Sequence, residues 1–425
     1  MKHTQNEKIM QIKVETLVVG IDIGKSAHYA RAFDYRGVEL GKLLRFANSA
    51  QGYAALDDWM RRIQQKSEKT EAIVGFEPTG HYWFTLGDHL QAEGHRLAIV
   101  NPYHVKCTRE LDDNSPTKND RKDPKTIAML VKDGRFRDVY IPEDVYQELR
   151  EAVWERERLQ EQLGSLSNQV IRWLDIHFPE FSVVFKDWRG KAAIRTLKDF
   201  STPAAVVAAG ADGIVRAWKK DMKKASLKKA ERIVGVAAES IGRKSGSNAA
   251  VASLRNLLTQ YEMVQRQAQE IEELMQALLL QVPNAGNLLT IKGIGMVTAA
   301  TIISEIGDIG RFKDPRQIIK LAGLALRENS SGKHKGKTTI SKRGRRRLRE
   351  ALFRVMIAML ANNREFRSLH QRNLNRTENP MNKMQSIVAL CGKLVRVLYA
   401  LLTKGVEYDS HKLIADMGRS MMVAA

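Results

Sequence analysis

Residues 15–24, ETLVVGIDIG, decide the fold, because a run of β-branched residues ends there on an acid. Val and Ile fill the run with little alternation, which is typical of a strand buried on both faces of a sheet. The run therefore predicts a buried strand that ends at Asp22. A second strand, AIVGFE at 72–77, ends on Glu77. The two predicted strands each carry a carboxylate at their end.

Two further acids, Asp120 and Asp123, lie in KNDRKDPKTIAML at the start of a helix predicted at about 120–133. Carboxylate oxygens are the ligands that hard divalent ions prefer, and cleavage of phosphodiesters by two metals needs ions about 4 Å apart held by several carboxylates. If the strands that end at Asp22 and Glu77 are neighbours, the four acids predict a Mg²⁺ site that can hold two ions.

Each acid also has a plainer explanation. Asp22 alone fits a strand-end cap, and Asp120 and Asp123 fit helix capping, since acids favour the first turn. Pro124 strengthens the capping explanation, because a residue without an N–H is favoured at a helix start. Two acids in the preceding polar stretch, Asp112 and Asp113, are expected to lie in a loop and not to bind metal.

The order of the predicted elements is three strands, a helix, a strand, a helix, a strand, a loop and a helix. The strands are expected at 15–23, 28–35, 39–47, 72–77 and 96–102, and the helices at 50–66, 81–94 and 120–133. This succession is expected of an α/β domain of the ribonuclease H or RuvC type. We place that domain at 12–140.

The composition favours a nucleic-acid partner. The 425 residues carry a formal net charge of +21, which attracts polyanions. A membrane surface is the competing partner, but no uninterrupted apolar run is long enough to span a bilayer and the N-terminus lacks a signal-peptide core. Two cysteines exclude a disulfide framework and a cysteine-based zinc site, and indicate a cytoplasmic protein.

The rest of the chain reads as mostly helical. Long charged helices are predicted at 143–180 and 249–281, on either side of a basic, poorly periodic insertion at about 182–250. The pair predicts an antiparallel coiled-coil arm over 143–282, for which dimerisation and an intramolecular hairpin are equally good explanations. A further domain is expected at 283–365 and a C-terminal helical extension at 366–425. Two amphipathic helices in the tail, within 350–403, are expected to pack as a cap.

Two motifs in the C-terminal half can bind phosphate. The Gly-Ile-Gly turn in LLTIKGIGMVTAATIISEIGDIGRF (288–312) resembles a helix-hairpin-helix, whose amides hold phosphate. Residues 333–349 contain nine Lys or Arg and no acid. The side chains and turns expected to contact nucleic acid are Lys292, Gly293, Gly295, Arg327, Lys333, Lys335, Lys337, Lys342, Arg343, Arg345, Arg346 and Arg347.

Ser330 and Ser331 stand in RENSSGKHKGK, beside glycines that let a backbone approach a phosphate closely. A serine hydroxyl is a weak nucleophile unless a base, a cation or a metal activates it. His334 is near but lacks an evident acidic partner. The residues alone therefore favour a solvated loop that contacts phosphates over a catalytic serine.

Taken together, these segments resemble the DEDD transposases of insertion sequences, which include the Piv and MooV-like DNA invertases. The resemblance covers about 15–135 and 285–365 and rests on GIDIGKSAHYA, GFEPTGHYW, VNPYHVK, KNDRKDPKTIAML, the glycine hairpin and LAGLALRENSSGKHKGKTTISKRGRRRLREALF. It implies a RuvC-like domain whose four acids match Asp22, Glu77, Asp120 and Asp123. It also implies a C-terminal domain whose nucleophilic serine matches Ser331, directly before Gly332, or its neighbour Ser330.

The resemblance further implies the reaction and the partners. The serine attacks DNA and becomes covalently linked to it, and the acidic site supplies magnesium to the same step across a protomer boundary. Members of the family are serine recombinases guided by a bridge RNA. We therefore expect DNA, a structured guide RNA and a homo-oligomer, a dimer or a tetramer, as partners.

Three departures from the family pattern stand out. Pro124 occupies a position where the family usually has a small helix-favouring residue, and this bears on the placement of Asp123. Lys292 replaces the usual proline before the hairpin glycines. The insertion at 182–250 is longer than in compact members, and its lysine clusters predict RNA contact.

The sequence thus predicts a magnesium-dependent, RNA-guided transposase. Two alternatives stay open: a RuvC-type structure-specific endonuclease that uses water, and a non-catalytic nucleic-acid-binding protein. VGIDIGKSAHYARAF also looks like the first phosphate loop of sugar kinases and actin-like ATPases. The second half of the chain lacks the Asp-x-Gly-Thr/Ser loop that those proteins need, and the positive charge argues against a small-molecule kinase.

Overall fold

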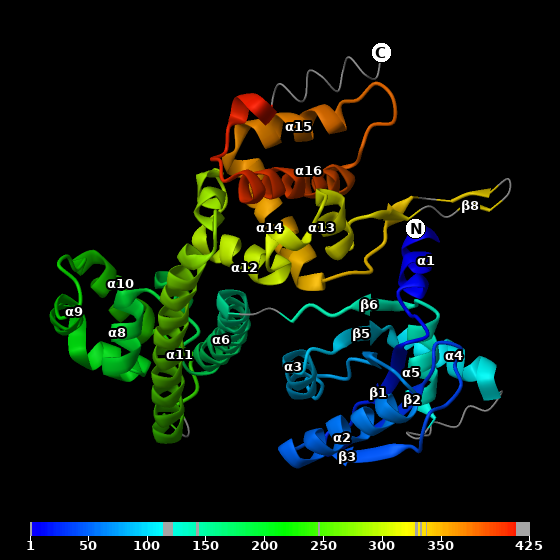
Figure 1. Cartoon of the computed structure of the whole chain (residues 1–425). Coiled ribbons are helices and arrows are strands. Elements are labelled where there is room, and N and C mark those ends of the chain that lie inside the picture. The colour runs from blue at the N-terminus through cyan, green and yellow to red at the C-terminus, as the bar shows by residue number, and fades with distance from the viewer. Residues whose placement is uncertain are drawn as a thin grey trace. The chain divides into compact units, whose positions relative to one another are not determined.

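The computed structural model of the chain (Figure 1) describes residues 2–113, 122–141, 144–244, 247–327, 330–331, 334–336 and 338–413. The chain forms two compact units, Met1–Ile141 and Pro142–Ala425. Each unit has apolar cores of its own.

The N-terminal unit is built on a six-stranded sheet in the order β3-β2-β1-β4-β5-β6. Neighbours along β1-β4-β5 are parallel, and the remaining pairs are antiparallel. This mixed sheet confirms the predicted α/β class and is compatible with a ribonuclease H-like domain. Its elements are α1 (Lys2–Met10), β1 (Thr16–Asp22), β2 (Ala27–Phe33), β3 (Leu44–Ala47), α2 (Ala50–Lys66), β4 (Glu71–Phe76), α3 (Phe84–Ala92), β5 (Arg96–Val100), α4 (Pro102–Asp113), α5 (Asp123–Lys132) and β6 (Phe136–Asp138).

Alternation along β1 places its side chains in two apolar layers. Leu17, Val19 and Ile21 pack in a core with residues of α2 and α3. Val18 packs in the opposite core, with Ile127 and other residues of α5. The strand is therefore covered on both faces, as its unbroken apolar pattern predicts.

Two glycines form the surface on which α5 lies. Gly20 of β1 and Gly75 of β4 are partners in the register of the two parallel strands. A Cβ atom at Gly20 would stand 2.7 Å from the Ala128 backbone nitrogen and closer still to the Pro124 carbonyl oxygen. A Cβ at Gly75 would clash with Val131. The absence of side chains at this pair therefore lets α5 approach the sheet directly.

The N-terminal unit differs from prediction mainly at its margins. Pro102, expected to stop a strand, begins helix α4, where a loop was predicted; proline suits the first turn of a helix because it needs no hydrogen-bond acceptor there. Helix α1 and strand β6 were not predicted. Strand β3 is shorter than the predicted 39–47, and α5 begins at Asp123 within the described residues.

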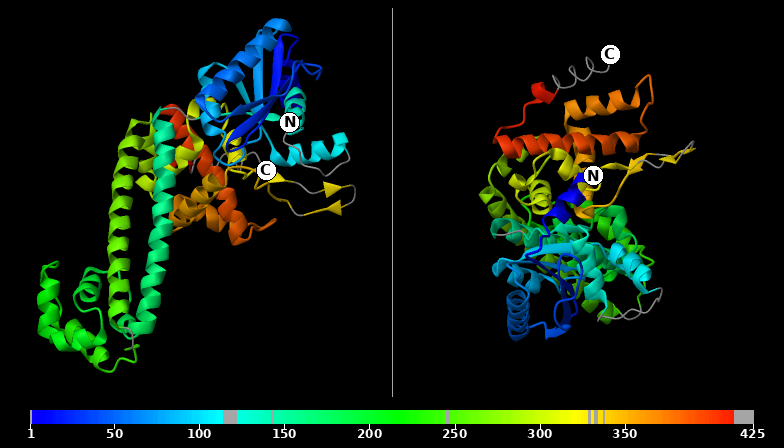
Figure 2. Two further views of the ribbon diagram at one scale, coloured as in Figure 1. Left: turned by 90° about the horizontal axis from the view of Figure 1, so that it is seen from below. Right: turned by 45° about the vertical axis from the view of Figure 1, so that its right-hand side comes forward.

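The C-terminal unit begins with an antiparallel helical hairpin. Helices α6 (Asp144–His177) and α11 (Ser247–Gln281) lie side by side (Figure 2). Arg156 Nε donates to Glu272 Oε1 at 2.6 Å, and Trp173 Nε1 donates to the Ala250 carbonyl at 2.8 Å, so the helices run in opposite directions. Both predicted long helices are confirmed, while their supercoiling and a role in dimerisation stay predictions.

The segment between these helices is also helical, as expected of the insertion. It contains α7 (Phe181–Val184), α8 (Lys191–Asp199), α9 (Pro203–Lys219) and α10 (Leu227–Ala238). These helices share an apolar core with one end of the hairpin. Trp218, 1% exposed, lies in this core and donates its indole N–H to Thr196 Oγ1 at 2.9 Å.

The remaining helices share one large apolar core with the other end of the hairpin. They are η1 (Ala285–Thr290), α12 (Met296–Ile306), η2 (Ile309–Arg311), α13 (Pro315–Leu321), α14 (Arg346–Asn362), α15 (Arg364–Leu374) and α16 (Lys383–Lys404). The tail helices α14 and α16 belong to this core, and α15 was not predicted. The first arm of the predicted helix-hairpin-helix is the 3₁₀ helix η1, so only its second arm is an α-helix.

Helix α16 is long and apolar enough by length and composition to cross a membrane, and it is the single such helix in the described part of the chain. Lys393 and Arg396 interrupt it, and Leu390, Leu394 and Leu398 lie in the large core. The same pattern is found in the core helices of many folded domains.

The serine segment forms short antiparallel ladders instead of the expected loop. Strand β7 (Leu326–Arg327) pairs with β10 (Thr339–Ile340), and β8 (Ser330–Ser331) pairs with β9 (His334–Lys335). The backbone of Ser331 lies opposite that of His334.

Candidate active site at the carboxyl edge of the sheet

Asp22 and Glu77 lie side by side along the sheet edge. Asp22 is the last residue of β1, and Glu77 directly follows β4. Ile21 pairs with Phe76 in parallel register, so the two acids come next on adjacent strands. Both follow a glycine of the α5 surface by two residues, and strand alternation therefore points them to the α5 face. The condition that the two strands are neighbours is met.

Asp123 lies on the face of the sheet that α5 covers. It is the first residue of α5 and is 6% exposed. Pro124 follows it in the first turn, and the Pro124 carbonyl lies against Gly20. The N-terminus of α5 thus lies over the carboxyl-terminal half of β1. Pro124 fixes the start of the helix at this point and does not remove Asp123 from the sheet edge.

A turn held by a buried histidine follows Asp22. The Gly24 N–H donates to His28 Nδ1 at 3.3 Å, and His28 is fully buried beside the rings of Phe46 and Tyr53. Burial lowers the pKa of His28, which keeps the ring neutral and able to accept this bond. His28 therefore helps to position the chain directly after Asp22.

The carboxylate chemistry suits a hard divalent ion, but the described residues do not form a closed ligand set. No group of three or more His, Cys, Asp or Glu side chains in the described ranges lies close enough to hold a metal. Asp120 lies outside those ranges. Asp22, Glu77 and Asp123 thus share one edge and one face of the sheet, and their role as ligands stays a prediction.

Several positioning residues escaped the sequence reasoning. Gly20 and Gly75 carry no chemistry, yet they allow α5 to bring Asp123 to the edge. Their signal was present: each predicted strand has a glycine two residues before its acid.

Ser330 and Ser331 form strand β8, and part of the basic segment around them lies outside the described residues. Lys333 and Lys337 lie outside the described residues. Asp112 and Asp113, expected in a loop, lie in α4. Arg327 in β7 is exposed. Catalysis by Ser331, or by Ser330, stays a prediction.

The arginine run at the start of α14 mostly serves the fold. Arg345 donates to the Glu305 backbone carbonyl, and Arg346 pairs with Glu350 at 2.6 Å. Arg347 pairs with a glutamate of α6 at 3.1 Å and lies over the ring of Trp154 at 5.0 Å. Arg345 and Arg347 are therefore tied to other helices of the unit, whereas Arg346 pairs within its own helix and its side chain is 81% exposed.

Other predicted phosphate contacts are exposed. Lys342 and Arg343 make no ion pair among the described residues. Lys292 is exposed in the turn before α12, and Gly293 has a φ of +105°, which favours glycine. Gly295 is the N-cap of α12. The turn thus leaves the first amides of α12 at the surface, as an anion site requires.

Two transposase family models match this chain. The first, described as "Transposase", matches residues 19–179 and so includes all four acids. The second, described as "Transposase IS116/IS110/IS902 family", matches residues 285–371 and includes the glycine hairpin and both serines. The matches cover the same two parts of the chain as the motifs quoted above.

Individual relatives agree with these matches. A Streptomyces coelicolor protein, "Insertion element IS110 uncharacterized 43.6 kDa protein", is 23% identical over 92% of this chain and 95% of its own length. The Coxiella burnetii "Transposase for insertion sequence element IS1111A" is 31% identical over 33% of this chain and 38% of its own length. The Moraxella bovis "Pilin gene-inverting protein" is 31% identical over 29% of this chain and 38% of its own length. Such relatives support a transposase or recombinase.

Proposed function

We propose that this protein is an insertion-sequence transposase that cleaves and rejoins DNA strands with the acids at the carboxyl edge of its sheet. The observation that carries the proposal is the placement of Asp22 and Glu77 on neighbouring parallel strands, with Asp123 delivered to the same face by α5. The similarity of this segment to transposases supports DNA as the substrate.

Asp22, Glu77, Asp120 and Asp123 would hold divalent metal, and we propose Mg²⁺. A divalent ion bound there would polarise the phosphodiester and stabilise the charge that develops on it. The protein's own contribution is rigidity. The strand ends fix Asp22 and Glu77, the α5 surface fixes Asp123, and His28 holds the turn after Asp22.

We propose Ser331, with Ser330 as the alternative, as the nucleophile. Its oxygen would form a bond to phosphorus while the bond from phosphorus to one sugar oxygen breaks, and the proton lost by serine would balance the one gained by the released sugar hydroxyl. The proposal is supported by the family resemblance and by the glycine after Ser331, which leaves room for a phosphate.

Guide RNA and oligomerisation complete the proposal. The lysine clusters at the ends of α9 and α10, which include Lys219, Lys220, Lys228 and Lys229, would contact the RNA backbone. If charge reversal of Lys219, Lys220, Lys223 and Lys224 left the affinity for co-purifying RNA unchanged, RNA contact by this insertion would be wrong. Assembly into a dimer or tetramer would let the serine of one protomer meet the acids of another.

Cleavage of the element's own ends tests the function. Asp22→Asn and Glu77→Gln should each abolish metal-dependent cleavage. The matched control Asp58→Asn changes an exposed acid of α2 and should cut normally. Ser331→Ala should lose both cleavage and the covalent protein–DNA adduct seen in denaturing gels. Retained cutting by Ser331→Ala and Ser330→Ala would instead indicate hydrolysis by water. Retained cutting by Asp22→Asn would refute the acidic site.

A further inference from the structure

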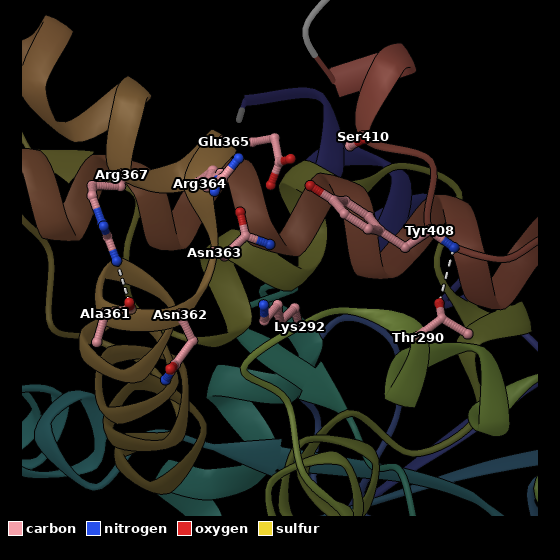
Figure 3. Close-up of a pocket in the computed structure, with 10 residues that line it drawn as sticks. All are labelled: Thr290, Lys292, Ala361, Asn362, Asn363, Arg364, Glu365, Arg367, Tyr408 and Ser410. Carbon is pink, nitrogen blue, oxygen red and sulfur yellow. Dashed lines mark hydrogen bonds between the residues drawn. The ribbon is translucent and has the colours of Figure 1, made fainter.

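A polar hollow lies in the C-terminal unit, formed by three segments far apart in sequence. It has a volume of about 490 Å³ (Figure 3). One wall is the turn that carries Thr290 and Lys292, another is the α14–α15 junction, and the third is the segment after α16 with Tyr408 and Ser410. A hollow of this size is within the range of ligand sites.

Hydrogen bonds fix the walls. The Tyr408 backbone N–H donates to Thr290 Oγ1 at 3.0 Å, which joins residues 118 positions apart. At the junction, Arg367 Nε donates to the Leu360 carbonyl at 2.9 Å and its guanidinium also bonds the Ala361 carbonyl (Figure 3). The hollow is therefore held by the fold and does not depend on a ligand to form it.

The donors around the hollow suit an anion. Lys292 and Arg364 are exposed and make no ion pair in the described part of the chain. The N-terminus of α15 also opens here: its N-cap Asn363 accepts a hydrogen bond from the Phe366 N–H, and the Arg364 and Glu365 N–H groups lack partners within the helix. Among the described lining residues, one acid, Glu365, faces three cations, Lys292, Arg364 and Arg367.

The Tyr408 hydroxyl adds a donor of a different kind. Its oxygen is buried, and it makes no hydrogen bond within the described residues. Burial raises the pKa of Tyr408, the neighbouring Asn363 amide lowers it in part, and the Glu365 and Asp409 carboxylates raise it further, so the phenol stays protonated. A buried hydroxyl without a partner is costly unless a ligand accepts from it.

We propose that this hollow binds a backbone phosphate of a nucleic acid, with Lys292, Arg364 and the Tyr408 hydroxyl as its donors. The proposal rests on the proposed function, which supplies the nucleic acid, and adds a site in the C-terminal unit that is separate from the acidic residues. A phosphodiester suits the hollow because it offers several acceptor oxygens and a negative charge, and because the hollow's cations are long side chains at an open rim.

The test measures binding of the full-length protein to labelled single-stranded DNA, duplex DNA and single-stranded RNA of equal length, by fluorescence anisotropy over a range of salt. The Lys292→Gln/Arg364→Gln variant should bind at least one probe about tenfold more weakly, and its plot of log affinity against log salt should be shallower by about one to two units. The control Lys383→Gln/Arg354→Gln removes the same charges from exposed positions outside the hollow and should keep the parental slope.

Two milder variants guard against misfolding. Tyr408→Phe should weaken binding several-fold with an unchanged salt slope, because it removes a neutral donor. Glu365→Gln should tighten binding several-fold, because it removes the only acid of the hollow among its lining residues. A general loss of structure cannot produce tighter binding.

The probe that responds identifies the source of the phosphate: DNA, RNA or both. If the Lys292→Gln/Arg364→Gln variant kept the parental affinity and salt slope for every probe, the phosphate site would be wrong, while the proposed function would still stand. If the parent binds and cleaves no DNA at all, the proposed function itself fails. Weaker binding by Glu365→Gln would also contradict a phosphate site.

Discussion

The closest approach of α5 to the sheet offers a sharp test of how the acids are positioned. In Gly20→Ala, the new methyl group would stand 2.7 Å from the Ala128 nitrogen and closer still to the Pro124 carbonyl. Ordinary contact requires at least 3.4 Å, so α5 must retreat by about 0.7 Å even for the less severe of these contacts. Both partners are backbone atoms, and no side chain can rotate away to relieve the clash.

Two effects should follow from this retreat. Overpacking of a tight core costs about 1–3 kcal/mol, which should appear as a lower free energy of unfolding in urea. The retreat also carries Asp123 away from Asp22 and Glu77, and displacements of about 1 Å at a reacting centre can cost about 100-fold in rate. We therefore expect Gly20→Ala to lose about 30- to 100-fold in metal-dependent DNA cleavage while remaining folded.

The control is Gly164→Ala, at a position in α6 where an added methyl group meets nothing within 4 Å. It should raise the free energy of unfolding by about 0.5–1 kcal/mol, since alanine is the better helix former. Cleavage should be unchanged. Parental stability and cleavage in Gly20→Ala would refute the reasoning that the glycine pair positions α5.

Three further predictions follow from buried groups. Arg150→Met should lower the free energy of unfolding, measured in urea titrations, by about 2–4 kcal/mol. Arg150 is 9% exposed and donates two hydrogen bonds, at 3.0 and 2.9 Å, to the Ser304 carbonyl, which would lose both donors. A loss below about 0.5 kcal/mol would contradict this. Because the pKa of His28 is lowered in the folded protein, the unfolded chain takes up a proton there at a higher pH than the folded chain does. The free energy of unfolding should therefore hold its full His28 contribution above about pH 6.5 and fall as the pH drops toward the folded pKa. His28→Gln should flatten this pH dependence in unfolding curves measured between pH 5 and 8. Burial raises the pKa of the Cys391 thiol to about 12, so iodoacetamide should modify the half-buried Cys107 before Cys391 in the native protein. Mass spectrometry measures both rates of modification, and equal rates would argue against the burial of Cys391.

Local patterns predicted the site's framework well. Apolar runs that end on an acid placed Asp22 and Glu77 at strand ends, and the structure meets the condition that β1 and β4 are neighbours. The approach of α5 could not be predicted, because the contact of Gly20 with a helix more than 100 residues away depends on packing and leaves no periodic signal. Pro102 shows the same limit on a smaller scale, since proline can follow a strand or open a helix.

Sequence could not show which basic side chains have partners within the chain. The run that contains Arg345 and Arg347 has the composition of a phosphate-binding loop, yet both side chains contact distant parts of their own chain. Sequence shows the charge of a side chain but not a partner some 190 residues away. Conversely, Arg364 and Tyr408 lie in segments of ordinary composition, and only folding brings them beside Lys292.

The hairpin of α6 and α11 divides the C-terminal unit into two apolar cores that meet along the same pair of helices. Helices of 34 and 35 residues span about 50 Å at 1.5 Å per residue, so α8 to α10 pack at one end of the hairpin and α12 and α14 at the other. Separate cores tend to open as separate cooperative units. We therefore expect amide hydrogen exchange to show two levels of protection. Helices α8 to α10 would unfold and refold while the core that holds α12 and α14 stays folded.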